Sequence, residues 1–270
     1  MLKMKKFACV ALAAALCVTA FAGCGSSKDA GSAAGGDSSA SDLSGKSIYV
    51  VSREEGSGTR DAFTELTGVM EKDANGEKVD NTAVSAEITS STSVMMTTVA
   101  GNKTAIGYIS LGSLDDTVKA LKVNGVEPSP ETVKDGSYTI ARPFNIVTKE
   151  GGVSEAAQDF IDYIMSADGQ KIIEKEGYIS EAKGAKAYKA SGLKGTITLA
   201  GSTSVAPVME VLADNYKKLN DGVEIEIQQT GSGAGIQSTI EGVCDIGMAS
   251  RALEDEESKE GLESKQIALD

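Results

Sequence analysis

Short runs of β-branched residues alternate with longer amphipathic stretches from residue 47 onward, and this alternation constrains the fold more than any other feature. It predicts an α/β architecture, in which most strands are followed by a helix that covers the sheet. The predicted strands span residues 47–51, 105–109, 118–123, 141–148, 196–200, 223–229 and 245–248. The predicted helices span residues 59–69, 91–99, 131–134, 153–165, 169–176, 205–219 and 234–241.

The N-terminal region lies outside this alternation. Lysines among the first six residues precede an apolar stretch at residues 7–21, and small residues then lead to Cys24. This pattern is typical of a secretory signal and is too short for a stable transmembrane anchor. Residues 25–45 are almost entirely Gly, Ser, Ala and Asp, a composition that predicts a flexible tether. The four residues ending at Cys24 resemble a bacterial lipobox, which implies a signal peptide over residues 1–23 and a lipidated Cys with a linker over residues 24–45.

Composition excludes several classes of function. Removal of the signal takes away three lysines and no acids, which leaves 23 basic and 39 acidic residues and a net charge of −16. Such a charge argues against nucleic-acid binding, and it requires any anion site to be local. Histidine is absent, which excludes Ser-His-Asp and Cys-His catalysis and His-ligated zinc. Cys244 is the one cysteine after Cys24, so no internal disulfide is expected and Cys244 is predicted to be a small core residue.

Three segments share one construction, in which a strand is followed by a turn of Gly, Ser and Thr and then by a helix. They span residues 50–59, 199–204 and 227–235. A helix N-terminus offers unpaired N–H groups and about half a positive charge, glycine allows close approach, and hydroxyls add donors. Arg53 is the one guanidinium in these turns and can make a bidentate contact. If the turns converge, they suit a dehydrated tetrahedral oxyanion.

Each turn also has a structural interpretation, because Ser and Thr are common helix N-caps and Gly is common in turns. Residues 231–235 have glycines like those of a dinucleotide-binding loop but lack the third glycine at the required spacing. None of the turns contains the Gly-Lys-Ser/Thr of a P-loop, and no Ser-x-x-Lys motif opens a helix near them. Three turns in one chain, each after a strand, favour anion binding over capping alone.

At these residues the chain resembles the phosphate-binding subunit of the bacterial phosphate ABC transporter. Four stretches are similar to signature motifs of that family, namely residues 52–60, 201–207, 231–235 and 245–251, and residues 105–110 and 141–144 match further family segments. The resemblance covers nearly everything after the tether. It implies an α/β type 2 periplasmic-binding-protein fold, with two α/β lobes and a ligand cleft between them.

The resemblance also implies a phosphate site drawn from both lobes. Arg53 is the implied charge partner of the anion. The implied hydroxyl donors are Ser57, Thr59, Thr203 and Ser232, and the implied backbone donors are Gly58 and Ser204. Ser250 stands where some family members have an Asp that accepts the proton of phosphate. A serine acceptor weakens one ground for excluding sulfate.

The segment order is inverted relative to the usual family order, because residues 52–60 here precede residues 201–207. A circular permutation with the same three-dimensional site is therefore expected. The family normally continues beyond the last residues of this chain, so a truncated C-terminus is expected. The predicted lobes are residues 46–115, incomplete and carrying the Arg53–Thr59 turn, and residues 116–270, carrying the other two turns.

The chain is accordingly predicted to be a binding protein, not an enzyme, with no cofactor and no metal. It is expected to capture inorganic phosphate on the extracytoplasmic face of the bacterial cell membrane, held there by its lipid. It would deliver phosphate to the permease and ATPase subunits of an ABC importer. Open alternatives are a receptor for sulfate, molybdate or tungstate, and a surface lipoprotein acting as sensor, adhesin or scaffold. A phosphate-ester hydrolase is disfavoured by the absence of histidine and of an obvious carboxylate metal cluster.

Overall fold

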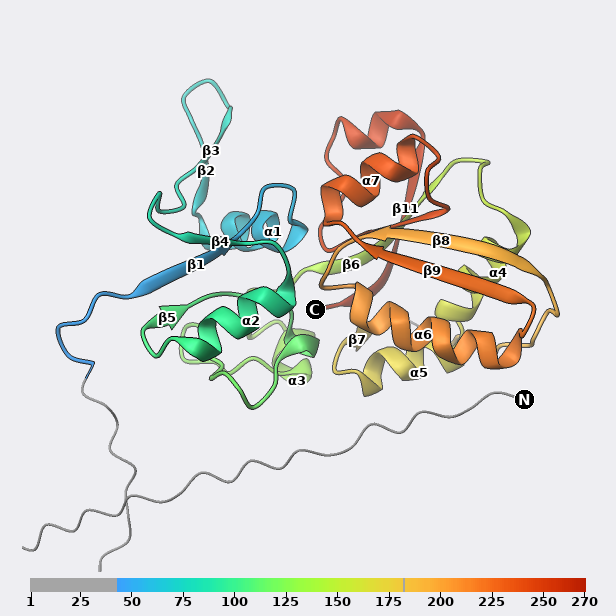
Figure 1. Ribbon diagram of the computed structural model, residues 1–270, viewed down its shortest axis with the longest axis horizontal. Helices are drawn as coiled ribbons and strands as arrows, with labels where there is room; N and C mark the ends of the chain where they lie inside the picture. The colour runs from blue at the N-terminus through green and yellow to red at the C-terminus, as the bar shows by residue number, and fades with distance from the viewer. Residues whose placement is uncertain (1–42, 182) are drawn as a thin grey trace, which may run out of the picture. The chain divides into compact units, whose positions relative to one another are not determined.

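The computed structural model describes residues 43–181 and 183–270, which belong to one compact unit. The predicted signal peptide, Cys24 and most of the predicted linker lie outside the described residues. The unit contains a three-stranded sheet, a six-stranded sheet and a two-stranded hairpin. We call the region around the three-stranded sheet the small lobe and the region around the six-stranded sheet the large lobe (Figure 1). The α/β class predicted from the alternation is confirmed.

The sheet of the large lobe has the strand order β7-β11-β6-β10-β8-β9. Its strands are β6 (Pro143–Lys149), β7 (Ile179–Ser180), β8 (Gly195–Gly201), β9 (Val223–Gln229), β10 (Ile246–Ala249) and β11 (Leu262–Leu269). β8 pairs in parallel with both β9 and β10, whereas β6 runs antiparallel to its two neighbours β10 and β11. The acidic stretch at residues 254–263 forms only a short 3-10 turn, η2 (Glu257–Glu260), because β11 begins at Leu262.

Helices cover both faces of this sheet. α4 (Glu155–Ile164), α5 (Ala167–Lys175) and α6 (Ala206–Leu219) lie on one face, and α7 (Ser232–Ile240) lies on the other (Figure 1). Phe160, Ile164 and Leu212 are fully buried between the first face and its helices. Burying one such side chain stabilises the fold by about 1.5–3 kcal/mol. Ile236 of α7 packs on the second face in a much smaller cluster.

The small lobe repeats the central part of this arrangement. Its strands are β1 (Tyr49–Arg53), β4 (Glu87–Thr89) and β5 (Ala105–Ile106), and its helices are α1 (Gly58–Thr67) and α2 (Thr92–Gly101). Both edge strands pair in parallel with β1, so the order is β4-β1-β5. The order β9-β8-β10 in the large lobe is equivalent, because in both lobes the strand that comes first in the chain, β1 or β8, lies between the two later strands. A hairpin of β2 (Met70–Lys72) and β3 (Lys78–Asp80) follows α1.

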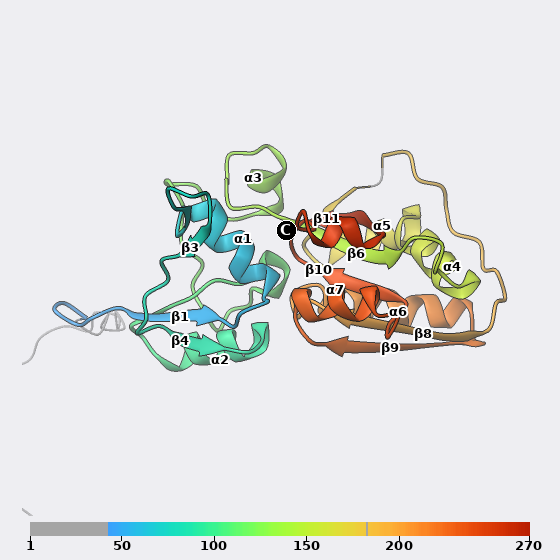
Figure 2. The same ribbon diagram turned by 90° about the horizontal axis from the view of Figure 1, so that it is seen from above.

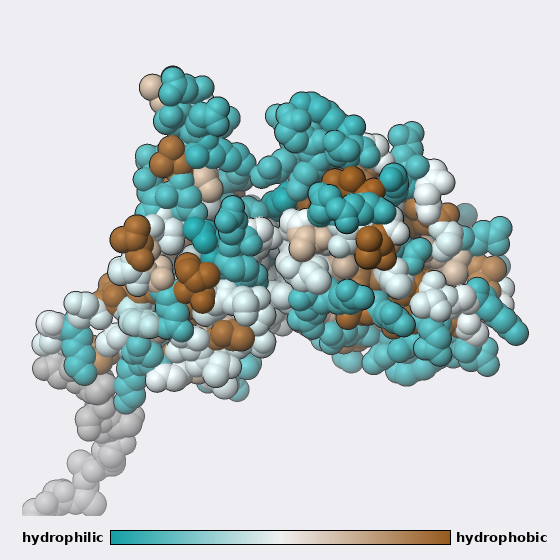
Figure 3. Space-filling model, turned by 45° about the horizontal axis from the view of Figure 1, so that its top comes forward, coloured by the Kyte–Doolittle hydropathy of each residue, from teal (hydrophilic) through white to brown (hydrophobic). Residues whose placement is uncertain are grey.

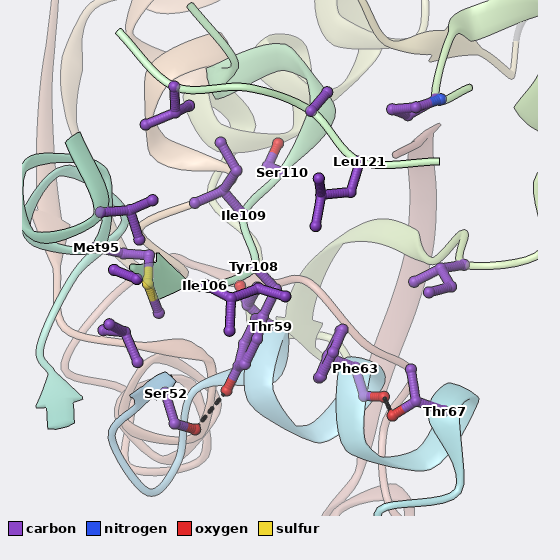
Figure 4. Close-up of a pocket in the computed structure, with 18 of the residues that line it drawn as sticks. Ser52, Thr59, Phe63, Thr67, Met95, Ile106, Tyr108, Ile109, Ser110 and Leu121 are labelled. Carbon is purple, nitrogen blue, oxygen red and sulfur yellow. Dashed lines mark hydrogen bonds between the residues drawn. The ribbon is translucent and has the colours of Figure 1, made fainter. Parts of the chain in front are cut away.

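A cavity of about 1040 Å³ opens in the small lobe, and its lining is mainly apolar. Phe63 of α1 stacks on Tyr108 in its wall, with ring centroids 4.1 Å apart (Figure 4). The strand predicted at residues 118–123 is wrong, since the only pairing there is an isolated bridge from Val123 to Val126. Among the described residues no strand pairs with the free edge of β5, so this segment has no ladder to join.

Within the described residues the chain crosses from one sheet to the other just before β6, and the end of β11 lies beside this crossing (Figures 1 and 2). Arg142 and Asp270 exchange both backbone hydrogen bonds, at 2.8 and 2.9 Å. The Asp270 carboxylate also accepts hydrogen bonds from the Ser110 hydroxyl and the Leu111 N–H group, each at 2.8 Å. The lobe boundary expected at residue 115 stays a prediction. Residues 117–123 line the small-lobe cavity, whereas the short helix α3 (Pro130–Lys134) contacts β7 of the large sheet.

Hydrophilic side chains predominate on the face shown in Figure 3, with hydrophobic residues scattered over both lobes. Within residues 43–181 and 183–270, no helix has both the length and the apolar character needed to cross a bilayer. Cys244 is buried and free, as predicted.

Candidate functional site

Four helices begin directly after strands, and their N-terminal turns meet where the two lobes face each other. β1 leads to α1, β4 to α2, β8 to α6 and β9 to α7. Because the strands of each set are parallel, their carboxyl ends lie at one edge of their sheet. Hydrogen bonds join the turns across the lobes. The structure therefore brings together the three turns predicted from the sequence.

Arg53 is the last residue of β1, and its side chain is only 1% exposed. Its Nε and Nη2 atoms donate to the two carboxylate oxygens of Glu54 at 2.8 and 2.7 Å. Nη2 also donates to the Thr203 hydroxyl in the large lobe at 3.0 Å, and Nη1 donates to the Thr92 hydroxyl at 3.5 Å. A buried guanidinium needs partners for its charge and its N–H groups. Here those partners come from both lobes.

A cluster of buried hydroxyls surrounds this guanidinium. Thr59 of α1 and Ser204 of the turn before α6 are hydrogen-bonded at 2.8 Å, from one lobe to the other. The Thr92 hydroxyl lies 3.2 Å from both the Thr203 and the Ser204 hydroxyls. A hydroxyl can donate or accept, so each of these groups can turn its hydrogen toward an anion without moving its oxygen.

The third turn adds Ser232 and Ser250. The Ser232 hydroxyl accepts a hydrogen bond from the Ser250 N–H group at 3.2 Å, and the two hydroxyls lie 3.4 Å apart. Gly58 of the small lobe approaches them so closely that a Cβ atom there would lie 2.4 Å from the Ser232 Oγ. A Cβ atom here would have to displace the Ser232 hydroxyl, so the close approach of the two lobes favours glycine at this position of the predicted motif. Across the same gap, the Gly233 N–H group donates to the Gly56 carbonyl at 3.0 Å.

Two predicted residues have local structural partners at the same edge. Ser57 is the N-cap of α1, and its side chain accepts a hydrogen bond from the Arg60 N–H group at 3.4 Å. The Ser204 N–H group donates to the Ser202 hydroxyl at 3.2 Å. The capping interpretation holds for Ser57 but not for Ser204, because the N-cap of α6 is Val205 and has no side-chain cap. Both Ser57 and Ser204 are also buried beside the cluster.

Sequence reasoning missed Thr92 and Glu54. Thr92 opens α2, is 5% exposed, and donates its N–H to the Thr203 hydroxyl at 3.4 Å. Its signal was a Ser-Ser-Thr run before a helix, but the strand before it, β4, spans only Glu87–Thr89 and the turn contains no glycine. Glu54 lies within a predicted motif, but nothing in the motif indicates that both of its carboxylate oxygens accept hydrogen bonds from Arg53.

The backbone that presents Arg53 is itself fixed. The Tyr108 hydroxyl accepts from the Arg53 N–H group at 3.1 Å and is hydrogen-bonded to the Ser52 hydroxyl at 2.8 Å. Burial raises the pKa of Tyr108 above its ordinary value, and its hydrogen bond with Ser52 opposes that rise. The phenol therefore stays neutral and keeps the end of β1 in place.

The chemistry available at this cluster is that of anion binding. Hydroxyls, N–H groups and one guanidinium dominate it, and Glu54 is the carboxylate bonded to that guanidinium. Within the part of the chain that the structure describes, no group of three or more Asp, Glu or Cys side chains is placed to hold a metal ion. The arrangement can stabilise a compact oxyanion by several charge-assisted hydrogen bonds.

Comparisons with known proteins agree with this chemistry. A family model described as a PBP superfamily domain matches residues 34–168 and 186–269. The phosphate-binding protein PstS 2 of Streptococcus agalactiae serotype V is 53% identical over 237 residues, which cover 88% of this chain and 80% of that protein. The phosphate-binding protein PstS 2 of Streptococcus pneumoniae serotype 4 is 48% identical over 239 residues.

A crystal structure of a phosphate-binding protein of a phosphate ABC transporter, from Streptococcus pneumoniae TIGR4, superposes with a TM-score of 0.65. It is 48% identical and covers 83% of this chain and 86% of its own. The predicted periplasmic-binding-protein fold is therefore confirmed.

The alignments also bear on segment order. The two streptococcal alignments each cover 88% of this chain, which keeps its segments in the order found here. The phosphate-binding protein PstS of Bacillus subtilis strain 168 aligns at 34% identity over only 51% of this chain. Relative to the two streptococcal proteins the segment order is therefore not inverted, and a permuted order relative to other family members stays a prediction.

Proposed function

The chain belongs to the PBP superfamily, and from this premise we propose that it captures inorganic phosphate where its two lobes meet and delivers it to an ABC importer. Its relatives named phosphate-binding protein PstS 2 are similar over most of the chain. The observation that carries the proposal is the meeting of Arg53 from the small lobe with Thr203 from the large lobe, at 3.0 Å, inside a cluster of buried hydroxyls.

The proposed mechanism is closure of the two lobes on the anion. Phosphate would lie between Arg53 and Thr203 and exchange their direct hydrogen bond for bonds to its own oxygens. The N-terminal turns of α1, α2, α6 and α7 supply further donors and favourable dipoles. Only the closed arrangement lets both lobes donate, so bound phosphate shifts the lobe equilibrium toward closure. The importer would then recognise the closed form.

Each proposed site residue has a role in this mechanism. Arg53 neutralises charge, and the hydroxyls of Ser57, Thr59, Thr203 and Ser232 donate hydrogen bonds. Gly58 and Ser204 contribute backbone N–H groups, and we add Thr92 to the donors because it contacts Arg53, Thr203 and Ser204. In this mechanism the protein binds and releases phosphate and catalyses no reaction.

Ser250 favours a second candidate, a receptor for an oxyanion that carries no proton, such as sulfate. Its hydroxyl accepts a hydrogen bond from Ser202 at 3.0 Å, and it can donate to a ligand as readily as accept from one. A carboxylate at this place would repel a fully ionised anion, whereas a hydroxyl does not. Discrimination between phosphate and sulfate therefore depends on this position.

The N-terminal part of the proposal rests on the sequence. A lipid on Cys24 and the Gly- and Ser-rich linker would hold the binding unit at the extracytoplasmic face of the membrane, near the permease. Mass spectrometry of the protein extracted from membranes tests this. A diacylated cysteine at the mature N-terminus supports the anchor, and an intact or unlipidated N-terminus contradicts it.

Isothermal titration of the purified protein with phosphate and with sulfate tests the binding function. We expect saturable heat with one phosphate per chain and weaker binding of sulfate. Absence of binding to phosphate by folded protein would refute the proposal. The variant Ser250→Asp sharpens the test, because it should widen the preference for phosphate over sulfate. Tighter sulfate than phosphate binding by the wild type would favour the second candidate.

A further inference from the structure

Arg251 directly follows Ser250 at the end of β10 and reaches out of the large lobe. Its Nε atom donates to the Asp61 carboxylate of α1, in the small lobe, at 3.0 Å. The Arg251 side chain is only 11% exposed and that of Asp61 is 27% exposed. This ion pair therefore crosses from lobe to lobe beside the site, in partly desolvated surroundings.

The large lobe holds Arg251 rigidly. Nη1 and Nη2 each donate to one carboxylate oxygen of Glu257 at 2.7 Å, a bidentate pair within the lobe. Nη1 also donates to the Ala252 carbonyl at 2.9 Å, and the Asn145 side chain donates to the Arg251 carbonyl at 2.8 Å. The guanidinium is thus fixed in position before it meets Asp61, and little side-chain entropy is lost on contact.

On the other side, Asp61 lies in the first turn of the helix that contributes to the proposed site. α1 begins at Gly58, and Thr59 and Asp61 are within its first turn. A contact that fixes Asp61 therefore also fixes the approach of Gly58 and Thr59 to the large lobe. Neither Arg251 nor Asp61 is itself among the residues that would touch the anion.

We propose that Arg251 and Asp61 form a latch that stabilises the closed arrangement of the lobes and thereby sets the affinity for the ligand. This inference rests on the proposed function for its effect on binding, but its effect on lobe closure does not depend on it. The latch acts on the positions of the ligand-binding groups, so Arg251 is a positioning residue. Its loss should speed ligand release more than it slows association.

A second pair across the lobes serves as a control. Lys78 of β3 lies 2.8 Å from Glu65 of α1 and 3.5 Å from Glu254 of the large lobe, and these side chains are about half exposed. Solvent and salt screen such a pair, so its effect on closure should be negligible. The variant Lys78→Gln removes it without touching the latch or the site.

The experiment uses the single variants Asp61→Asn and Arg251→Gln, the double variant, and Lys78→Gln. Phosphate Kd and koff are measured by titration and stopped flow, and lobe closure in ligand-free protein is measured by small-angle scattering. Each single latch variant should raise Kd about three- to tenfold, mainly through koff, and shift the scattering toward a more open form. The Kd of the double variant for phosphate should not exceed the higher of the two single-variant Kd values, because both substitutions remove the same contact.

Four results would overturn the latch. The first is an unchanged Kd and unchanged scattering in Asp61→Asn, and the second is fully additive effects on Kd in the double variant. The third is a rise in Kd for Lys78→Gln equal to that of the latch variants. The fourth is a latch variant whose melting temperature falls while its koff for phosphate is unchanged. Failure of the proposed function looks different. In that case the wild type does not bind phosphate, while the scattering of the ligand-free variants still reports whether the latch holds the lobes together.

Discussion

The two lobes build the same three-stranded parallel unit with different degrees of burial. In the large lobe the central strand β8 carries Ile197 and Leu199, which are 0% and 1% exposed. In the small lobe the central strand β1 begins with Tyr49 and Val50, which are 41% and 37% exposed, and its one fully buried apolar side chain is Val51. Both strands nevertheless end in a turn that presents buried polar groups to the same cluster.

This difference shows that stability and site geometry have separate sources. The large lobe is stabilised by an apolar core on its sheet, whereas the small lobe has an open cavity beside β5. Arg53 and Thr59 of the small lobe are buried all the same, and their hydrogen-bond partners include Thr203 and Ser204 across the gap. Contact between the lobes therefore helps to order the half of the site that has the weaker core.

The largest expected effect separates the two cores. Phe160→Ala removes a fully buried ring from the large lobe, and cavity formation should lower the free energy of unfolding by about 3–5 kcal/mol. Phe63→Ala removes a half-buried ring that stacks on Tyr108 in the small lobe, and it should cost about 1–2 kcal/mol. Urea denaturation measures both. Equal losses of unfolding free energy in the two variants would contradict the difference in core packing between the lobes.

The next prediction concerns how the lobes share the binding of phosphate. Arg53→Ala removes the charged partner and should weaken phosphate binding about 10- to 100-fold, from a charge-assisted hydrogen bond of about 1.5–3 kcal/mol. Thr203→Val removes a neutral donor from the large lobe and should weaken binding about two- to tenfold. Calorimetric titration of folded variants compares them. If Thr203→Val weakened phosphate binding more than Arg53→Ala, the assignment of the main charged partner of phosphate to the small lobe would be wrong.

Two glycines in helices test how tightly each lobe is packed. A Cβ atom at Gly235 of α7 would lie 2.4 Å from the Gly201 Cα and 2.5 Å from the Ala200 carbonyl, so Gly235→Ala must displace backbone. It should destabilise the protein by about 1–3 kcal/mol. A Cβ atom at Gly101 of α2 meets nothing within 4 Å, and Gly101→Ala should be neutral or stabilising by about 0.4–1 kcal/mol. Thermal denaturation measures the stability change of each variant. Similar losses of stability in Gly235→Ala and Gly101→Ala would contradict the difference in packing.

The smallest effects concern pH. Burial raises the pKa of Asp61, which faces Arg251, Glu254 and Glu65, and Arg251 only partly opposes the rise. Burial also acts to raise the pKa of Asp80, but hydrogen bonds from Thr82 and Arg60 lower it overall. The folded protein therefore binds a proton at Asp61 more readily than the unfolded chain does, and the reverse holds at Asp80.

These opposite shifts predict opposite slopes. As pH rises above the ordinary Asp value of 3.8, wild type should lose stability relative to Asp61→Asn. As pH falls below that value, wild type should lose stability relative to Asp80→Asn. Each change should stay under about 1 kcal/mol, because both side chains are partly exposed. Urea denaturation over a pH series measures the slopes, and slopes of the same sign would contradict the assignments.

Much of the fold and of the site could be predicted because the responsible signals are local. A strand followed by a Gly-, Ser- and Thr-rich turn and a helix fixes the direction of Arg53 and Thr203, and parallel pairing then brings such turns to one edge. Thr92 was missed because the strand before it, β4, is short and polar and no glycine marks the turn. The predicted strand at residues 118–123 failed because a strand needs a partner that its own sequence does not specify. Arg251 and Asp61 are 190 residues apart in the chain, so no local pattern could pair them.

A crystal structure of the protein grown with phosphate would locate the anion. We expect one phosphate between the lobes, within about 3 Å of the Arg53 guanidinium and of the Thr203 and Ser232 hydroxyls. Phosphate bound elsewhere, or touching residues of one lobe only, would contradict this expectation.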